Sequence, residues 1–461
     1  MSFSDLIFLF YFLPLFFAVY YIVPLRFKNA VLALGSAAFY FLGAGVRDCV
    51  LLGASVVLHY ALARGMEGRT LRARRALLVF GLCVDLFGLV YFKYAAFLLE
   101  NLGKLTGTAF SLVELALPLG ISFYLFQSVG YLIDVSRGRP AEKSFVDFSA
   151  FVLAFPQLTM GPILRYDEWR GALKERTITR EDIFLGFECF AVGLCFKVLL
   201  ADQLAPLWAS LERIGYGYLS APLAWLGAVS YSLQLYFDFS GYSLMAMGLG
   251  QMLGLPVPRN FDLPYTARSV SEFYRRWHIT LGTWFRDYLY IPLGGSRRGK
   301  ARTALALTVV WVFTGLWHGA SWNFVLWGVM LLAFILLEKF CIGGFLKKHA
   351  LLSHLYLLFV IPQTWVIFRI TKLSDIGAYF SRLFPFFGTH SAVSAQDALK
   401  LLASYWWLLL LAIFFCLPQP RRFYEKHCGS LALDLPLFLL FWVCVYFIAT
   451  SSGNAFLYSR F

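Results

Sequence analysis

Long apolar runs alternate with short polar loops along nearly the whole chain. About twelve of these runs could cross the hydrocarbon core of a bilayer, which takes a helix of roughly 20 residues. Backbone groups cannot stay unpaired in lipid, and the runs are far too long for barrel strands. The pattern therefore predicts an all-α polytopic membrane protein with about 11–12 transmembrane helices. The expected spans are 5–24, 30–46, 49–63, 76–98, 112–134, 183–203, 219–237, 303–317, 320–340, 352–370, 402–417 and 430–450.

Two further segments are apolar but interrupted, and we expect them to be re-entrant or amphipathic. Residues 145–162 contain Pro156, Gly161 and Pro162 and have basic residues on both sides. Residues 259–302 interleave aromatic side chains with nine Lys or Arg and three acids. Such segments can neither cross lipid nor behave as plain hydrophilic loops.

The distribution of charge predicts the orientation. Residues 64–75 hold five arginines and one acid, and basic residues collect in the cytoplasmic loops of membrane proteins. Counting spans from this loop places the N-terminus outside and the basic residues near 26–28 and 137–143 inside. The same rule explains the net charge of +14, so we expect contacts with membrane lipids and no nucleic-acid partner.

The composition supports a membrane protein without a metal or disulfide framework. Hydrophobic residues make up 60% of the chain and charged residues 14%, with a mean hydropathy of +0.68, whereas soluble domains keep roughly a quarter of their residues charged. The eight cysteines are scattered through apolar runs without a C-x-x-C pair. They predict neither disulfides nor a zinc site.

One histidine lies inside an apolar stretch, FTGLWHGASWNFVLWG, at residues 313–328. A charged side chain in a membrane segment costs roughly 2.5–3.5 kcal/mol, which makes His318 a functional candidate; a hydrogen bond to a neighbouring helix is the structural alternative. Gly315 and Gly319 would let a backbone or ligand approach closely. A neutral imidazole in a dry pocket can take a proton from a hydroxyl, which is the chemistry of acyl transfer to an alcohol.

Polar side chains follow His318 within about one turn. On a continuous helix Ser321 and Trp322 share its face, whereas Asn323 does so only if the helix is broken there. Trp317, Trp322 and Asn323 carry N–H groups of the type that stabilises an oxyanion, but the sequence does not supply the geometry that would select one.

A second histidine, His278, lies in SVSEFYRRWHITLGTWFRDYLYIPLGG, residues 269–295. Two interpretations remain open from spacing alone. The segment could contact lipid head groups, or it could form a basic pocket for a phosphate-rich ligand such as coenzyme A, with Arg275, Arg276, Arg286 and Arg297 as charge partners. We expect the remaining histidines to be surface or structural residues: His59, His349, His354, His390 and His427. The candidate donor-site or tunnel residues are Arg275, Arg276, Trp277, Arg286, Asp287, Trp317, Ser321, Trp322 and Asn323.

The ordered pair of R-R-W-H and L-W-H-G motifs strongly resembles the membrane-bound O-acyltransferase family, in particular its bacterial branch of alginate O-acetylation proteins. The stretches DFSGYSLMAMGLG (238–250) and FPQLTMGPILR (155–165) are similar to other parts of that branch. The resemblance implies a tunnel in the bacterial cytoplasmic membrane, through which acyl groups pass from the cytosol to an extracytoplasmic acceptor. It also implies a single membrane domain over 1–461, with N-terminal helices in 1–135, a catalytic core in 136–340 and C-terminal helices with an outward-facing tail in 341–461.

The resemblance also implies roles for particular residues. The family's essential histidine matches His318, which we expect to act as general base, and its second motif histidine matches His278, which we expect to orient the donor or support developing charge. The C-terminal FLYSRF resembles an aromatic motif whose tyrosine, here Tyr458, has been proposed as an acyl carrier; Ser459 replaces the motif's central phenylalanine. Leu244 stands where relatives usually carry an acid.

The function implied is O-acetylation of an extracytoplasmic polysaccharide such as alginate or peptidoglycan. Acetyl-CoA is the expected donor, no bound cofactor is expected, and relatives act with a membrane-anchored or periplasmic acetyltransferase partner. One alternative is D-alanyl transfer from a carrier protein to teichoic acids. A transporter or flippase with proton-relaying histidines would predict paired repeats, and no internal symmetry is evident in the sequence.

Overall fold

The computed structural model describes residues 1–108, 110, 116–384, 386, 394–450 and 456–457. Within these residues the secondary structure is helical, apart from one isolated antiparallel bridge between Phe261 and Trp277. The all-α prediction is therefore confirmed. Tyr458 and Ser459 lie outside the described residues, so the acyl-carrier role of Tyr458 stays a prediction.

The chain folds into two compact units, each built from segments that are far apart in the sequence. Unit 1 comprises Met1–Phe190, Leu244–Pro258 and the described residues of Val445–Arg460, and unit 2 comprises Ala191–Ser243 and Arg259–Cys444. The predicted division at residues 135/136 and 340/341 stays a prediction.

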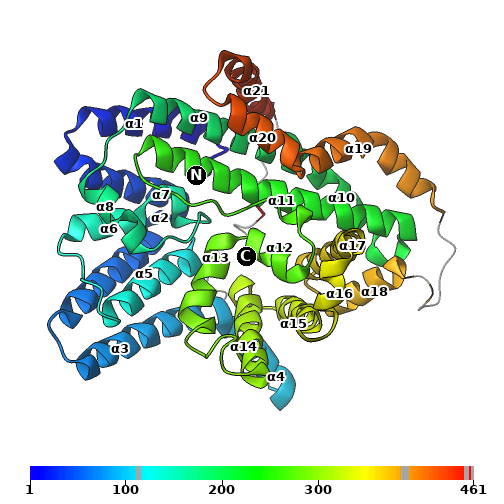
Figure 1. Cartoon of the computed structure of the whole chain (residues 1–461), viewed down its shortest axis with the longest axis horizontal. Helices are drawn as coiled ribbons and strands as arrows, with labels where there is room; N and C mark the ends of the chain where they lie inside the picture. The colour runs from blue at the N-terminus through cyan, green and yellow to red at the C-terminus, as the bar shows by residue number, and fades with distance from the viewer. Residues whose placement is uncertain (109, 111–115, 385, 387–393, 451–455, 458–461) are drawn as a thin grey trace. The chain divides into compact units, whose positions relative to one another are not determined.

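Unit 1 is a group of long and short helices, and α2 packs against several of them. Helix α2 packs against α3, α5 and α6, and α3 packs against α5 (Figure 1). The helices are α1 (Leu13–Ile22), α2 (Leu25–Met66), α3 (Leu71–Leu89), α4 (Ala95–Thr106), α5 (Ile121–Ser136), α6 (Phe145–Leu153), α7 (Phe155–Leu158), α8 (Tyr166–Lys174) and the start of α9 (Arg180–Cys195), with π-helical turns η1 (Phe8–Phe12) and η2 (Val90–Tyr94).

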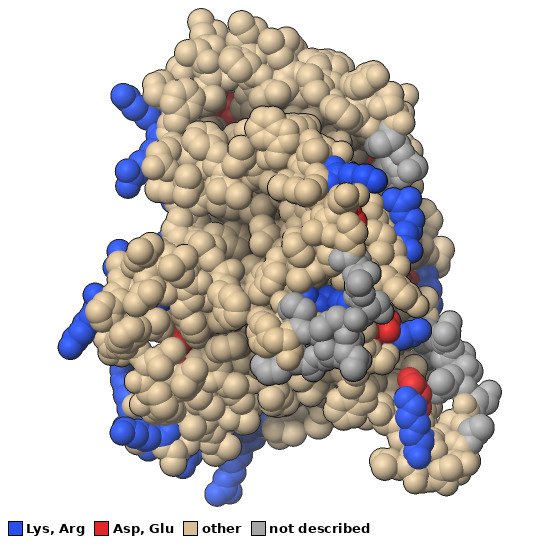
Figure 2. Space-filling view, turned by 90° about the vertical axis from the view of Figure 1, so that its right-hand side faces the viewer, with Lys and Arg blue, Asp and Glu red and all other residues tan. Residues whose placement is uncertain are grey.

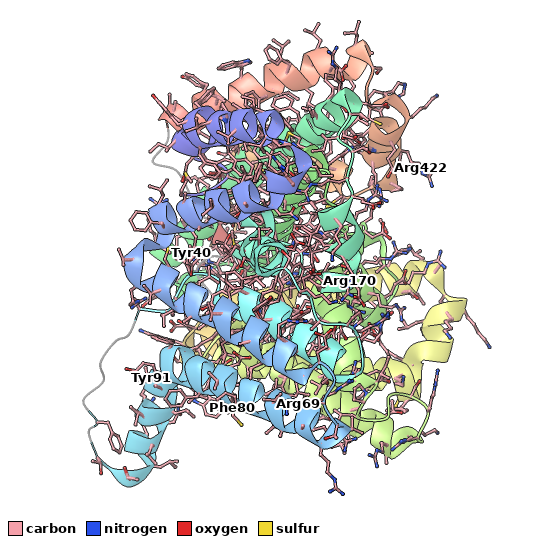
Figure 3. All side chains as sticks on the ribbon, turned by 90° about the vertical axis from the view of Figure 1, so that its left-hand side faces the viewer. Tyr40, Arg69, Phe80, Tyr91, Arg170 and Arg422 are labelled. Atoms are coloured by element: carbon pink, nitrogen blue, oxygen red, sulfur yellow. The ribbon has the colours of Figure 1, made fainter. Side chains whose placement is uncertain are left out.

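Helix α2 contains two of the predicted spans. They meet at Gly45, whose φ of 81° and ψ of −178° break the helix, a conformation that glycine adopts without a steric cost. The basic residues at the start of α3 lie near the loop after α5: a Cβ added to Gly138 would be 4.0 Å from Nη1 of Arg74. In Figure 3, Arg69 and Arg170 lie toward one side of unit 1, and Tyr40 and Tyr91 lie toward the other. This agrees with the predicted placement of both basic regions on one side of the membrane.

The segment 145–162 does not form a spanning helix, as expected. Helix α6 ends at Leu153, Ala154 leaves helical geometry with φ −46° and ψ 112°, and α7 has Pro156 in its first turn. The freed backbone N–H of Phe155 donates to Oγ of Ser36 at 3.0 Å. An irregular backbone is tolerated at membrane depth where its polar groups find protein partners.

Unit 2 holds both motif histidines. Its helices α14 and α15 pack side by side, α15 also packs against α17, and the short α12 packs against α13, α15 and α17 (Figure 1). The helices are the end of α9, α10 (Asp202–Ile214), most of α11 (Ala221–Met252), α12 (Val270–Arg276), α13 (Ile279–Phe285), α14 (Lys300–His318), α15 (Trp322–Leu337), α16 (Gly343–Lys348), α17 (Ala350–Arg369), α18 (Leu373–Leu383), α19 (Gln396–Phe415), α20 (Pro418–His427) and most of α21 (Leu431–Thr450), with short turns η3 (Phe196–Ala201), η4 (Tyr216–Tyr218), η5 (Pro264–Thr266), η6 (Arg286–Tyr290) and η7 (Glu338–Ile342).

By length and composition, seven helices among the described residues could cross a membrane: Leu25–Met66, Leu71–Thr106, Arg180–Ile214, Trp322–Lys348, Ala350–Arg369, Gln396–Phe415 and Leu431–Thr450. The difference from about twelve spans has two causes. Two predicted spans share α2, and others match helices that are short or polar. Helix α11, for example, buries Gln234, Asp238 and Ser243. Uncharged residues cover most of the surface drawn in Figure 2, as a lipid-facing surface requires.

Candidate active site

The first motif histidine ends a helix at a tight crossing of two backbones. Helix α14 ends at His318, and α15 begins at Trp322 after the extended residues Gly319 and Ser321. A Cβ added to Gly315 would lie 2.5 Å from the carbonyl oxygen of Phe324. The structure thus confirms the predicted break and the close approach at Gly315, and these hold the imidazole at the end of α14.

The imidazole of His318 is enclosed by aromatic rings and is 4% exposed. Its ring lies 5.0 Å from that of Trp327, at 88°, and 5.1 Å from that of Phe368, at 82°. Such edge-to-face packing is a favoured arrangement of aromatic rings. The surrounding rings keep bulk water from His318.

The polar candidates after His318 fall into different environments. Asn323 is fully buried, and its Nδ2 donates to the carbonyl oxygens of Ile367 at 3.2 Å and Phe368 at 3.0 Å. It therefore ties α15 to the end of α17, and both contacts occupy the amide group that would have served an oxyanion. Trp322 is 49% exposed. Because the helix is broken, the shared face expected for Ser321, Trp322 and His318 does not form.

The second motif histidine is held in an unusual backbone conformation. His278 has a φ of 49°, which is uncommon for a residue other than glycine. It follows α12 and precedes α13, and the backbone N–H of Ile279 donates to the carbonyl oxygen of Asn260 at 3.0 Å. Backbone strain of this kind persists only where neighbouring structure fixes it, and it concentrates at functional sites.

Asn260 determines which nitrogen of His278 carries a proton. Its Oδ1 accepts the backbone N–H of Thr280 at 3.2 Å and lies 3.1 Å from Nδ1 of His278. A backbone N–H can only donate, so the amide atom at this point is the oxygen. Nδ1 of His278 therefore donates its proton to the same oxygen. Nε2 then carries the lone pair, and burial lowers the pKa of His278 from 6.5 to about 3, which keeps the ring neutral.

Aromatic contacts connect the two histidines. The Trp317 ring lies 4.8 Å from the ring of His318 and 5.9 Å from the ring of His278. A second series of ring contacts begins at Trp277, the residue before His278. The Trp365 ring lies 4.8 Å from that of Trp277 and 6.0 Å from that of Trp327, and Trp327 contacts His318. The structure therefore brings His278, His318, Trp277 and Trp317 into one connected group of rings, and their membership of one catalytic site stays a prediction.

The basic candidates separate into paired and unpaired cations. Arg276 pairs with Glu272 at 2.7 Å, and Arg286 pairs with Asp287 at 2.7 Å. Arg275 and Arg297 are exposed, and neither forms an ion pair with any residue that the structure describes. These two exposed arginines are therefore the better candidates to contact an anionic ligand.

Several residues at the site were not predicted from sequence. Asn260 selects the His278 tautomer, and Trp365 and Phe368 of α17 complete the aromatic enclosure. Glu338 is a buried acid within an apolar run, which could have marked it as a candidate. Lys197 lies 2.8 Å from both Asp202 and Asp238 and is 1% exposed. Asp238 directly precedes Phe239, whose ring packs 4.8 Å from His278.

Comparison with known proteins identifies the family. The model of the MBOAT, membrane-bound O-acyltransferase family, matches residues 82–378, which include both histidine motifs. This chain belongs to the membrane-bound O-acyltransferase family. It is therefore an acyltransferase and a multi-pass membrane protein, as the motifs predicted, and the transporter alternative is not supported.

Relatives within the membrane-bound O-acyltransferase family differ in how much of this chain they match. A probable alginate O-acetylase of Azotobacter vinelandii is 40% identical over 84% of this chain and 78% of its own length. A peptidoglycan O-acetyltransferase of Helicobacter pylori is 31% identical over 100% of this chain and 97% of its own. A teichoic acid D-alanyltransferase of Streptococcus thermophilus is 31% identical, but over only 46% of this chain and 54% of its own.

Proposed function

We propose that this acyltransferase moves acetyl groups from cytosolic acetyl-CoA, through the bacterial cytoplasmic membrane, for O-acetylation of an extracytoplasmic polysaccharide. The observation that carries the proposal is the position of His318. It ends α14, is buried among aromatic rings and contacts Trp317, which also contacts His278. A buried neutral imidazole of this kind suits general-base catalysis in a water-poor site.

The proposed reaction is attack of a hydroxyl on the thioester. His318 takes the hydroxyl proton while the hydroxyl oxygen bonds to the acetyl carbonyl carbon. Collapse of the tetrahedral intermediate breaks the carbon–sulfur bond, and the proton on His318 passes to the leaving thiolate. The step forms one ester and one thiol and needs no other reactant. Exclusion of water by the surrounding rings protects the thioester from hydrolysis.

The geometry of His278 favours one of its two expected roles. Because Nδ1 donates to Asn260, the lone pair of a neutral ring lies on Nε2. Such a nitrogen accepts a hydrogen bond from an N–H or O–H group of a substrate. We therefore propose that His278 orients a reactant, and not that it stabilises developing negative charge, which would require a proton on Nε2. Arg275 and Arg297 would contact the phosphates of the donor.

Two relatives support polysaccharide as the acceptor. The alginate and peptidoglycan enzymes match 84% and 100% of this chain, whereas the D-alanyltransferase matches 46%. We propose that a membrane-anchored or periplasmic acetyltransferase completes the transfer to the polymer. Tyr458 remains the proposed acyl carrier, and replacing it by phenylalanine tests this role, since full activity of Tyr458→Phe would exclude it.

The test uses a strain in which the gene is deleted and then restored as wild type, His318→Ala or His427→Ala. His427 is a half-buried histidine at the end of α20 and serves as the matched control. Ester-linked acetate is measured on isolated envelope and exopolysaccharide fractions. We expect acetate to disappear in the deletion and in His318→Ala, at equal membrane abundance, and to return with His427→Ala. Normal acetate in His318→Ala, or loss of ester-linked D-alanine instead, would contradict the proposal.

A further inference from the structure

Glu338 is a buried carboxylate at the end of the helix that follows His318. It is 5% exposed and begins the turn η7, which continues α15. Its Oε1 accepts the backbone N–H of Val270 at 2.5 Å. Its Oε2 accepts both the backbone N–H of Ser271, at 2.9 Å, and the Ser271 hydroxyl, at 2.6 Å. All three donors lie at the start of α12, the helix that leads to His278.

These hydrogen bonds explain how an acid is retained in an apolar segment. A buried carboxylate is costly unless hydrogen bonds satisfy both of its oxygens. Backbone N–H groups only donate, and here one N–H meets each oxygen. Hydrogen bonds to an ionised acceptor are about twice as strong as bonds between neutral groups. Glu338 therefore makes a strong and directional connection between α15 and α12.

The connection controls where the His278 segment lies. Helix α12 has seven residues, and Trp277 and His278 follow it directly. A helix this short has little stability of its own, so its position depends on tertiary contacts. Glu338 is separated from His318 only by the break and by α15. We propose that Glu338 is a positioning residue that holds the His278 segment in register with the His318 segment. The inference rests on the proposed function, because it assumes that both imidazoles serve one reaction.

The same short helix has a second cap that supplies a matched control. Oγ of Ser269 accepts the backbone N–H of Glu272 at 3.0 Å, and the backbone N–H of Arg268 donates to the Glu272 carboxylate at 3.0 Å. These two hydrogen bonds lie within residues 268–272 and do not involve α15. Ser269→Ala therefore weakens α12 locally, whereas Glu338→Gln weakens its connection to α15.

The glutamine variant tests the carboxylate itself, because it keeps the size of the side chain. Its amide oxygen can accept from one backbone N–H, but its amide NH₂ would face the other N–H and repel it. We therefore expect Glu338→Gln to be nearly as damaging as Glu338→Ala. Ser271→Ala removes one of the three hydrogen bonds and should have an intermediate effect.

The kinetic experiment measures acetyl transfer by the full chain in membrane vesicles over a series of acetyl-CoA concentrations. For Glu338→Gln we expect kcat to fall about 10- to 100-fold, the usual effect of losing a group that orients a functional side chain, with a smaller change in KM. Ser269→Ala should stay within about three-fold of wild type, since this cap contacts only α12 itself. Equal losses in both variants, or wild-type kcat in Glu338→Gln, would overturn the inference.

Hydrogen exchange of the full chain tests the connection independently of activity. We expect faster exchange over residues 270–281 in Glu338→Gln, and faster exchange confined to residues 268–273 in Ser269→Ala. Unchanged exchange over 274–281 in Glu338→Gln would overturn the inference even if no transfer is detected in any variant. If His318→Ala retains transfer, the proposed function fails and the exchange result still decides the role of Glu338. If Glu338→Gln does not reach the membrane, the kinetic and hydrogen-exchange measurements are made on Ser271→Ala instead.

Discussion

Nδ1 of His278 lies 3.1 Å from Oδ1 of Asn260, and the same oxygen accepts the backbone N–H of Thr280. This arrangement fixes the tautomer of a buried, neutral imidazole. The residues next to His278 in the sequence do not predict which tautomer forms. The partner lies 18 residues earlier in the chain. The role of His278 therefore depends on a side chain outside the histidine motif.

Replacing Asn260 by alanine should impair transfer through His278. Without the amide oxygen, the ring can place its proton on either nitrogen, and Nε2 loses its defined lone pair. We expect kcat to fall about 10- to 100-fold. Ser243→Ala is the control, because Ser243 contacts Asn260 only at 3.5 Å. Normal kcat in Asn260→Ala would show that the tautomer does not matter.

Replacing Asn260 by aspartate should change the pH dependence of transfer. In the wild type the pKa of His278 is about 3, so this ring contributes no loss of activity between pH 5 and 8. A carboxylate beside Nδ1 favours the charged ring and raises its pKa. Lowering the pH should then protonate Nε2 and reduce kcat at a higher pH than in the wild type. A pH profile identical to that of the wild type would contradict this expectation.

The crossing of α14 and α15 should be sensitive to one methyl group. A Cβ on Gly315 would lie 2.5 Å from the carbonyl oxygen of Phe324, a backbone atom that cannot rotate away. We expect Gly315→Ala to destabilise the protein by about 1–3 kcal/mol and to lower its melting temperature in detergent. Gly344→Ala, also in a helix, meets no atom within 4 Å and should be neutral or stabilising. Equal melting temperatures for the two variants would argue against the close crossing.

The two unpaired arginines should affect donor binding more than the paired one. Arg275→Gln and Arg297→Gln each remove an exposed charge that has no ion-pair partner among the described residues. We expect each to raise the KM for acetyl-CoA about two- to five-fold, as for the loss of one solvent-exposed ion pair. Arg286→Gln should change KM less, because Asp287 already neutralises Arg286. An unchanged KM in both Arg275→Gln and Arg297→Gln would place the donor phosphates elsewhere.

A buried hydrogen-bonded pair in unit 1 should be important for stability. Nε2 of His59 lies 3.0 Å from Oδ2 of Asp85, and the two side chains are 0% and 7% exposed. Asp85→Ala removes this hydrogen-bond partner of His59 and should cost about 1–3 kcal/mol, measured as a lower melting temperature. The double variant His59→Leu with Asp85→Leu should recover much of this loss. Glu100→Ala, which removes an exposed pair with Lys104, should change little.

The sequence by itself determined the fold class, the family and the break at His318. At the break, the predicted span 303–317 ends one residue before the observed helix Lys300–His318 does. The predicted span 320–340 begins two residues before the observed helix Trp322–Leu337. Hydrophobic runs and helix breaks are local properties of the chain, so they can be predicted from neighbouring residues. The two histidine motifs likewise carried the family assignment.

The tertiary structure alone decided which side chains complete the site. The contacts of Asn260, Glu338 and Trp365 join segments that are distant in the sequence. Local sequence patterns do not predict such contacts. The tertiary structure also distinguished Arg275 and Arg297 from Arg276 and Arg286, which form ion pairs with Glu272 and Asp287. The span count differed for the same reason, since a helix enclosed by others, such as α11, can bury polar side chains that lower its hydropathy. Hydrogen-bond partners and ring contacts depend on how helices pack, and the helices that pack together are often distant from one another in the sequence.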